Sequence, residues 1–304
     1  MFKNLNCELL GISGRQSEII ELALTYGFRG IDIDMADLVK RCQRGSFESA
    51  ARFLISSKLL VGGFECPIDL DSDDETYAAQ AALLNGVAEI ANRAEVAAAI
   101  VKVPAETDRL PYPEYFEVIR KRVSEICATF GKENIKVALD LQPMKDADVT
   151  KQFKFVKDVE GFVALVNSCS DAGIVFDSWN WFAGGGSAEQ LEQIGANRVH
   201  IIRMADCVEG VSAESATEED CLLPASTNVI DNVAYLKMIA AAGGDAPVSA
   251  RGRLATPGGT RDAFIGKTAD ALDLCLQEAG IPCTSRKPEM YSSGPPVAAA
   301  AASS

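Results

Sequence analysis

Ionisable and amide side chains recur along this chain directly after short apolar runs. In chain order they are Glu8, Asp32, Asp34, Glu65, Lys102, Asp140, Gln142, Asp177, Asn180, Arg203, Asp206 and Arg251. Burying such groups costs free energy unless they face a pocket, so their repetition at the same place in each unit predicts a shared polar cavity. Carboxylates can act as general acids and bases, and fixed positive groups such as arginine and lysine can stabilise negative charge that develops in a reaction.

The apolar runs and the amphipathic stretches between them predict strands that alternate with helices. The expected strands are Cys7–Leu10, Gly30–Ile33, Val61–Phe64, Ala99–Val103, Lys136–Leu141, Gly173–Phe176, Val199–Arg203 and Pro247–Ala250. The expected helices are Ser17–Tyr26, Phe47–Ser57, Glu75–Asn92, Glu114–Phe130, Glu160–Cys169, Ala188–Ile194, Asn232–Ala242 and Thr260–Ala279. Several strands are almost continuously apolar, as parallel strands covered on both faces are. The alternation predicts an α/β fold with right-handed crossovers.

The number of these units favours a single (β/α)8 barrel, the TIM barrel. A doubly wound open sheet uses the same local units, but no G-x-G-x-x-G sequence follows the first expected strand. Such barrels typically have about 250 residues and carry their chemistry at the carboxyl ends of the strands, where the polar side chains above fall. We expect one barrel domain over residues 1–286 and a flexible tail over residues 287–304, where the periodicity is lost.

Two glycine-rich turns, residues 182–187 and 256–261, precede expected helices. Backbone amides at such turns are able to bind an anion. Arg251, Arg253 and Arg261 surround the second turn, which contains Gly258 and Gly259. This arrangement favours an anionic group on the substrate, although a tight turn that simply requires glycine explains the same residues.

Two aromatic or titratable positions have both a structural and a functional interpretation. Trp179 either forms the floor of a sugar pocket or packs between strand and helix. His200 is the only histidine. Because side chains alternate along a strand, an inward Arg203 places Ile201 inward and His200 outward. We therefore expect His200 to be structural.

The composition excludes several classes of partner. The formal net charge is −14, whereas nucleic-acid binding requires a basic face, and the charge gives no support for an anionic membrane surface. The nine cysteines contain no C-x-x-C pair and predict neither a zinc knuckle nor a disulfide framework. With no signal peptide or membrane span expected, the sequence predicts a cytoplasmic protein. It is compatible with a homo-oligomer.

Four segments, "VALDLQP", "GIVFDSWNWFAGG", "RVHIIRMADC" and "VSARGR", occur in an order that resembles the sugar phosphate isomerase/epimerase family, the xylose-isomerase-like barrels. The likeness extends from the N-terminal region to about Gly280. The resemblance implies a divalent cation bound by Glu at the end of strand five, Asp at six, His at seven and Glu at eight. A further His follows the strand-six Asp by three residues. Endonucleases of this barrel use several histidines around zinc, and one histidine cannot build that site.

This chain departs from the family at most of those positions. The matching residues, in order, are Asp140, Asp177, Asn180 in place of the nearby His, Arg203 (three residues before Asp206, as the family's His precedes its Asp) and Arg251. Arginine has no lone pair for a metal and remains protonated. At 4 Å each guanidinium would repel a unit charge by about 4 kcal/mol at an effective dielectric constant near 20, and a divalent ion by twice that. We expect Arg203 and Arg251 to pair with Asp140 and Asp177 instead, with no tightly bound cofactor. A Mn or Mg ion is expected only if this alignment is wrong.

These observations support two hypotheses. The first is a sugar or sugar-acid isomerase or epimerase, in which Asp140 or Glu65 is the base and Asp177 orients an arginine. Arg203, Arg251 and Lys102 would then supply the positive charge. The residues expected to bind substrate are Gln142, Asn180, Trp179, Asp206, Arg253, Gly258 and Gly259. The second is a non-catalytic carbohydrate- or anion-binding protein, or a structural subunit, descended from the same family.

Overall fold

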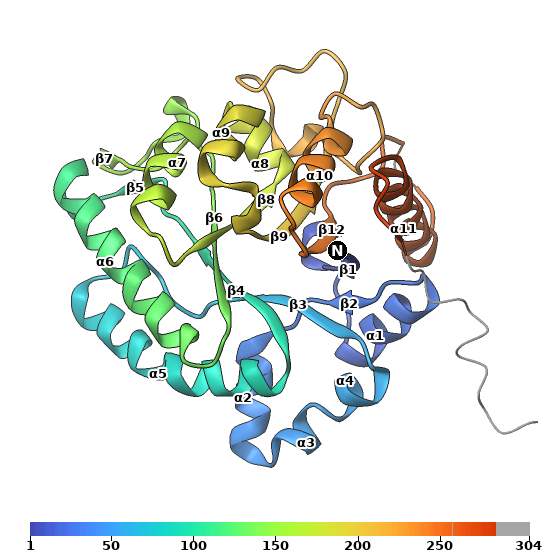
Figure 1. The fold of residues 1–304 in the computed structure, drawn as a ribbon, viewed down its shortest axis with the longest axis horizontal. Coiled ribbons are helices and arrows are strands. Elements are labelled where there is room, and N and C mark those ends of the chain that lie inside the picture. The colour runs from blue at the N-terminus through green and yellow to red at the C-terminus, as the bar shows by residue number, and fades with distance from the viewer. Residues whose placement is uncertain (257, 284–304) are drawn as a thin grey trace, which may run out of the picture.

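The computed structural model describes residues 1–256 and 258–283, and its main strands form a closed barrel. Figure 1 shows the strands at the centre of the molecule and the helices around them. The barrel strands are β1 (Phe2–Leu5), β2 (Gly30–Ile31), β3 (Leu60–Glu65), β4 (Val96–Lys102), β6 (Lys136–Asp140), β8 (Gly173–Asp177), β9 (Val199–Met204) and β12 (Pro247–Ala250). They neighbour one another in that order, β12 closes on β1, and every pair is parallel. The predicted (β/α)8 barrel is confirmed.

The helices follow the barrel strands along the chain and cover the outside of the barrel (Figure 1). They are α1 (Gln16–Thr25), α2 (Met35–Arg44), α3 (Phe47–Ala50), α4 (Arg52–Ser57), α5 (Asp74–Arg93), α6 (Tyr112–Gly131), α7 (Val159–Ser168), α8 (Ser178–Ala183), α9 (Ala188–Ile194), α10 (Asn232–Ala241) and α11 (Arg261–Glu278). Several begin where an Asp, Ser or Thr side chain accepts a hydrogen bond from a free backbone amide of the first turn, for example Asp73 before α5 and Thr260 before α11.

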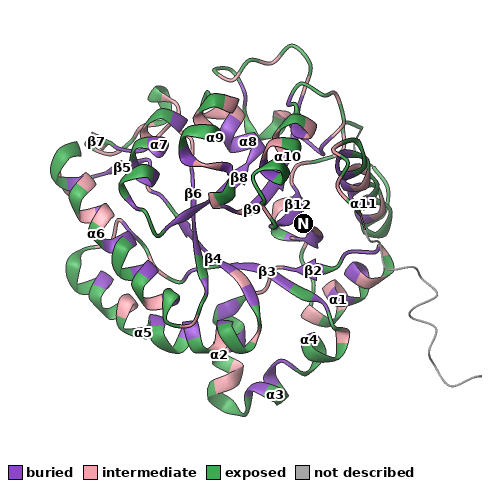
Figure 2. Ribbon diagram, viewed as in Figure 1, coloured by how far each residue is buried: buried purple, intermediate pink, exposed green. Residues whose placement is uncertain are grey.

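Apolar side chains are divided between two layers. Most pack between strands and helices, and Figure 2 shows buried residues along the strands and exposed residues on the outer faces of the helices. A smaller cluster fills the inside of the barrel and consists of Ala98, Ile100, Ala138, Val175 and Ile201. These side chains fill the barrel interior and leave no channel through it. A ligand can therefore bind only at an end of the barrel.

Two short hairpins extend the loops at the carboxyl ends of the strands. β5 (Glu106–Thr107) pairs antiparallel with β7 (Phe153–Lys154), and β10 (Asp206–Cys207) pairs antiparallel with β11 (Cys221–Leu222). The second hairpin carries a 3-10 turn, η4 (Glu218–Asp220), which lies beside the barrel mouth. In the part of the chain that the structure describes, no helix has the length and apolar character needed to cross a bilayer.

The prediction of the first strand was wrong. The strand is Phe2–Leu5, and Glu8–Leu10 forms a 3-10 turn, η1, that ends at Gly11 in the left-handed conformation. Two helices were also missed. In α2 only Met35 and Leu38 are buried, so the helical apolar repeat is short, whereas α8 is buried on nearly all sides and has no polar face. The tail expected over residues 287–304 lies outside the described residues.

Candidate functional site

One polar pocket opens at the carboxyl ends of the barrel strands and has a volume of about 900 Å³. Its lining includes many of the residues expected from the sequence, namely Glu65, Lys102, Asp140, Gln142, Asn180, Arg203 and Arg251. Each of them lies at or just after the end of a barrel strand. The parallel barrel therefore brings them together, because all its strands end at the same rim.

A buried ion pair joins β6 and β9 on one side of this mouth. Arg203 Nη1 donates to Asp140 Oδ2 at 2.8 Å, and these residues are 4% and 1% exposed. Burial raises the pKa of Asp140, and the attraction of Arg203 only partly offsets this effect. No donor among the described residues reaches Asp140 Oδ1. The predicted pairing of Arg203 with Asp140 is confirmed.

A second ion pair lies beside the first and joins β12 to β8. Arg251 Nη1 donates to Asp177 Oδ2 and to Asn180 Oδ1, both at 2.8 Å, and Arg251 Nη2 lies 2.8 Å from both carboxylate oxygens of Glu218. Burial lowers the pKa of Arg251, but the attraction of Asp177 and Glu218 outweighs burial and leaves that pKa raised. Asp177 Oδ1 also accepts the backbone amides of Trp179 and Asn180 at the start of α8. Asp177 therefore holds Arg251 and the start of α8 in place, and the predicted pairing of Arg251 with Asp177 is present.

The other side of the mouth carries charges that remain partly in water. Lys102 Nζ lies 2.7 Å from Glu65 Oε2, and both side chains are about half exposed. These side chains can change partner without leaving an unpaired charge in the protein interior.

Asp32 is a half-buried carboxylate in the same pocket, directly after β2. Its Oδ1 accepts from Asn4 Nδ2 and its Oδ2 from Asn6 Nδ2, each at 2.7 Å. Burial raises the pKa of Asp32, and these amides and the attraction of Arg203 only partly offset it. A carboxylate oriented by neutral amides, with a raised pKa, has the properties of a general base.

The strand geometry explains how Asn4 reaches Asp32. A Cβ atom on Gly62 of β3 would lie 2.5 Å from Asn4 Oδ1, so only glycine leaves room for this amide inside the barrel. The sequence analysis gave Asn4 and Asn6 no role because it placed the first strand after them. It noted Asp32 at a strand end but did not assign it a function.

Four expected site positions face away from the pocket. Asp206 is fully buried, and its carboxylate accepts backbone amides of Thr227, Asn228 and Ile230, so it holds its loop in place. Arg253 donates to the carbonyl of Glu219. Gly258 and Gly259 are exposed and have positive φ, which satisfies the tight-turn interpretation of that segment.

Trp179 and His200 also have structural surroundings. Trp179 is 1% exposed and packs with Ala205 and Cys221, behind the pocket wall, while its Nε1 donates to Glu218. His200 lies on the outer face of β9, opposite Ile201 in the barrel interior. Burial lowers the pKa of His200 to about 4, so its ring is neutral at neutral pH.

Two cysteines line the mouth without offering a nucleophile. Burial raises the pKa of the Cys7 thiol to about 11 and that of the Cys66 thiol to about 12. Because the thiolate is the reactive form, both side chains are unreactive at neutral pH.

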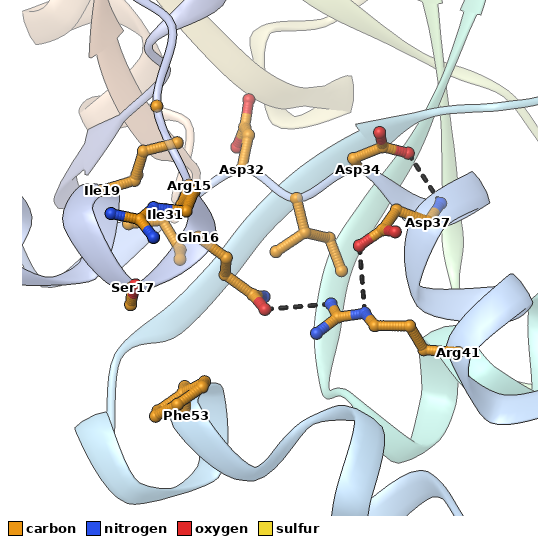
Figure 3. Close-up of a pocket in the computed structure, with 12 residues that line it drawn as sticks. Arg15, Gln16, Ser17, Ile19, Ile31, Asp32, Asp34, Asp37, Arg41 and Phe53 are labelled. Carbon is orange, nitrogen blue, oxygen red and sulfur yellow. Dashed lines mark hydrogen bonds and ion pairs between the residues drawn. The ribbon is translucent and has the colours of Figure 1, made fainter. Parts of the chain in front are cut away.

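A second groove of about 450 Å³ lies beside the mouth, between α1, α2 and α4 (Figure 3). Arg41 in this groove contacts the amide of Gln16 at 2.9 Å and the carboxylate of Asp37 at 3.0 Å. Asp32 borders both cavities, and Figure 3 shows its carboxylate pointing away from Arg41. The groove therefore adds space next to Asp32.

Comparison with known proteins decides the family. Residues 20–285 match the xylose isomerase-like TIM barrel family. The chain belongs to that family. A comparison with curated protein sequences gave no significant match.

Solved structures of this xylose isomerase-like fold resemble the chain at low sequence identity. A xylose isomerase domain protein from Alicyclobacillus acidocaldarius subsp. acidocaldarius has a TM-score of 0.80 at 19% identity, covering 92% of this chain and 99% of that one. The IolI protein with a bound zinc atom has a TM-score of 0.71 at 18% identity, with 92% and 98% covered. A D-psicose 3-epimerase with D-tagatose, from Clostridium cellulolyticum H10, has a TM-score of 0.64 at 11% identity, with 92% and 99% covered. At these identities the likeness establishes the fold.

The residues in the mouth of this xylose isomerase-like barrel do not fit a divalent cation. The two carboxylates at the family's ligand positions, Asp140 and Asp177, are each bound by a guanidinium at 2.8 Å. Within residues 1–256 and 258–283, no group of three or more His, Cys, Asp or Glu side chains is arranged to hold a metal ion. A cation here would meet two fixed positive charges and too few free donors.

Proposed function

We propose that this protein isomerises or epimerises a sugar or sugar acid by moving a proton next to a carbonyl, without a metal held by the chain. The observation that carries the proposal is Asp32. It is a pocket carboxylate with a raised pKa, set across the mouth from two arginines. Membership of a family that includes sugar-modifying enzymes supports the substrate class.

Asp32 is better suited to be the base than the two acids favoured from the sequence. Asp140 is 1% exposed and bound to Arg203, so substrate cannot reach it without breaking a buried ion pair. Glu65 is accessible but bound to Lys102. Asp32 is half-buried, and its carboxylate accepts from neutral amides that orient both oxygens.

The proposed reaction keeps atoms and charge in balance. The Asp32 carboxylate takes the proton from the carbon next to the carbonyl, and the C–H electron pair forms the enediolate while the carbonyl oxygen becomes negative. Arg203 and Lys102 in the pocket lining stabilise that oxygen. To give the isomer, the protonated Asp32 returns the proton to the former carbonyl carbon, while the proton of the adjacent hydroxyl moves to the negative enediolate oxygen. To give the epimer, water protonates the original carbon from the opposite face, and Asp32 returns its proton to the solvent.

A second candidate is a carbohydrate- or anion-binding protein without catalysis. Closed ion pairs in the barrel mouth favour it, because both donors of Arg251 described above are already engaged. Buried pairs of this kind are found in both catalytic and structural settings.

Deuterium incorporation separates the two candidates. In D2O, wild-type protein should introduce solvent deuterium next to the carbonyl of at least one member of a panel of ketoses and keto sugar acids, followed by NMR. Asp32→Asn should lower the rate at least about 100-fold, because it removes the base. Asp34→Asn is the matched control: Asp34 also borders the pocket, and asparagine retains its capping of α2. Equal loss in both variants, or no exchange by wild type with any panel member, contradicts the proposal.

A further inference from the structure

An exposed glutamate side chain forms an ion pair with Arg251 at the edge of the barrel mouth. Glu218, the first residue of η4, has a side chain that is 72% exposed. Both of its carboxylate oxygens nevertheless lie 2.8 Å from Arg251 Nη2, and Oε1 also accepts from Trp179 Nε1 at 3.1 Å. Arg251 and Trp179 thus form a seat for one carboxylate.

The seat is held in place without Glu218. The Arg251 side chain is only 15% exposed, and its Nη1 is fixed by Asp177 and Asn180. Trp179 is fully packed in an apolar cluster. The next residue, Gly252, has a φ of +102°, and a Cβ there would lie 2.6 Å from the carbonyl of Leu222, so the backbone after Arg251 packs directly on β11. The donors are therefore preorganised, whereas their occupant lies mostly in water.

The occupant can be exchanged at small cost. An ion pair with one partner largely exposed contributes little to stability, because water solvates the free carboxylate almost as well. Without Glu218, Arg251 Nη2 and Trp179 Nε1 lose the carboxylate that they share. A carboxylate on a ligand restores the same contacts.

We propose that the seat formed by Arg251 and Trp179 binds the carboxylate of a sugar acid, which displaces Glu218. The choice of a sugar rests on the proposed function; the choice of a carboxylate rests on the group that fills the seat. Glu218, Arg251 and Asp32 line one cavity, so a ligand anchored at the seat has its chain directed into the space next to Asp32. A phosphate fits less well, because the carboxylate of Asp177 lies on the other nitrogen of the same guanidinium.

Calorimetric titration with D-gluconate tests this proposal. The probe has a carboxylate and a polyol chain but no carbonyl, so its binding is independent of catalysis. D-Sorbitol, which has a hydroxymethyl group in place of the carboxylate, is the neutral control. Glu218→Ala should tighten the binding of D-gluconate about 10-fold, equivalent to about 1.4 kcal/mol, and leave D-sorbitol unchanged. Glu219→Ala, a neighbouring exposed acid whose backbone carbonyl contacts Arg253, should change neither.

The outcomes are distinct from those of the proposed function. Tighter D-gluconate binding without deuterium exchange on any keto sugar supports the seat and contradicts the proposed catalysis. Exchange on neutral ketoses, with D-gluconate binding unchanged by Glu218→Ala, does the reverse. The seat is also refuted if D-gluconate binds to neither protein, if D-sorbitol gains as much, or if D-sorbitol 6-phosphate binds the variant more tightly than D-gluconate.

Discussion

The two sides of the barrel mouth differ in how their charged side chains are buried and paired. On the side of β6, β8, β9 and β12, the acids Asp140 and Asp177 are bound to Arg203 and Arg251 and are almost completely buried. On the side of β1 to β4, Asp32 is held by neutral amides, and the pair of Glu65 and Lys102 is half exposed. One side is closed by internal partners, and the other keeps its groups available.

Within the same rim, the buried ion pairs hold the structure together, and the accessible groups remain available for chemistry. The arginines stand at positions where the family resemblance places metal ligands, so the departures from the family fall on the closed side. Fixed guanidinium groups place positive charge at these positions. The open side provides a carboxylate that can take up and release a proton. We infer that the arginines of the closed side provide the positive electrostatic field and that Asp32 on the open side transfers the proton.

Breaking the closed side should have the largest effect on stability. Asp140→Ala leaves Arg203 buried without its partner and should lower the free energy of unfolding by about 3–5 kcal/mol, measured by urea denaturation. The double variant Asp140→Leu with Arg203→Met removes both charges and should recover most of that loss.

The open side provides the matched control for this experiment. Glu65→Ala breaks an ion pair that is half exposed and should cost less than about 1 kcal/mol. If Asp140→Ala were no more destabilising than Glu65→Ala, the distinction between the two sides would be wrong.

The pH dependence of exchange sharpens the role of the open side. Because the folded-state pKa of Asp32 is raised above its usual 3.8, the base is protonated at low pH. Exchange should therefore rise about tenfold per pH unit below the folded pKa and level off above it, with a midpoint above 3.8. The same shift makes the protonated form more compatible with the fold. Its stabilising contribution is full below 3.8 and is lost as the pH rises through the raised value. A midpoint at or below 3.8 in the exchange profile would exclude Asp32.

Much of the fold was predictable because hydrophobic periodicity reports burial directly. The expected bounds of β12 and α9 agree with the structure, and the other strands after the first differ by a few residues. The first strand was misplaced because Lys3 and Asn4 are polar residues that are buried in the folded protein, where tertiary contacts override their pattern. Lys3 is neutralised by Asp273 in α11, more than 200 residues away in the chain.

The site was predictable only where chemistry follows from residue type. The pairing of arginines with carboxylates follows from charge and geometry, so Arg203 with Asp140 and Arg251 with Asp177 were found. The contribution of Glu218 depends on how a long loop folds back over the mouth, which no local periodicity encodes. Asp206 has the same residue type as the pocket acids, but its hydrogen bonds to a neighbouring loop turn its carboxylate away from the pocket. No feature of the sequence shows which acids face the pocket and which face away from it.

The most direct test of this account is the rate of solvent deuterium exchange before and after exhaustive dialysis against a chelator. We predict that the rate survives dialysis unchanged and falls at least about 100-fold in Asp32→Asn. Loss of exchange on chelation, with recovery on adding one equivalent of Mn²⁺ or Zn²⁺, would contradict the claim that arginines in this mouth supply the positive charge.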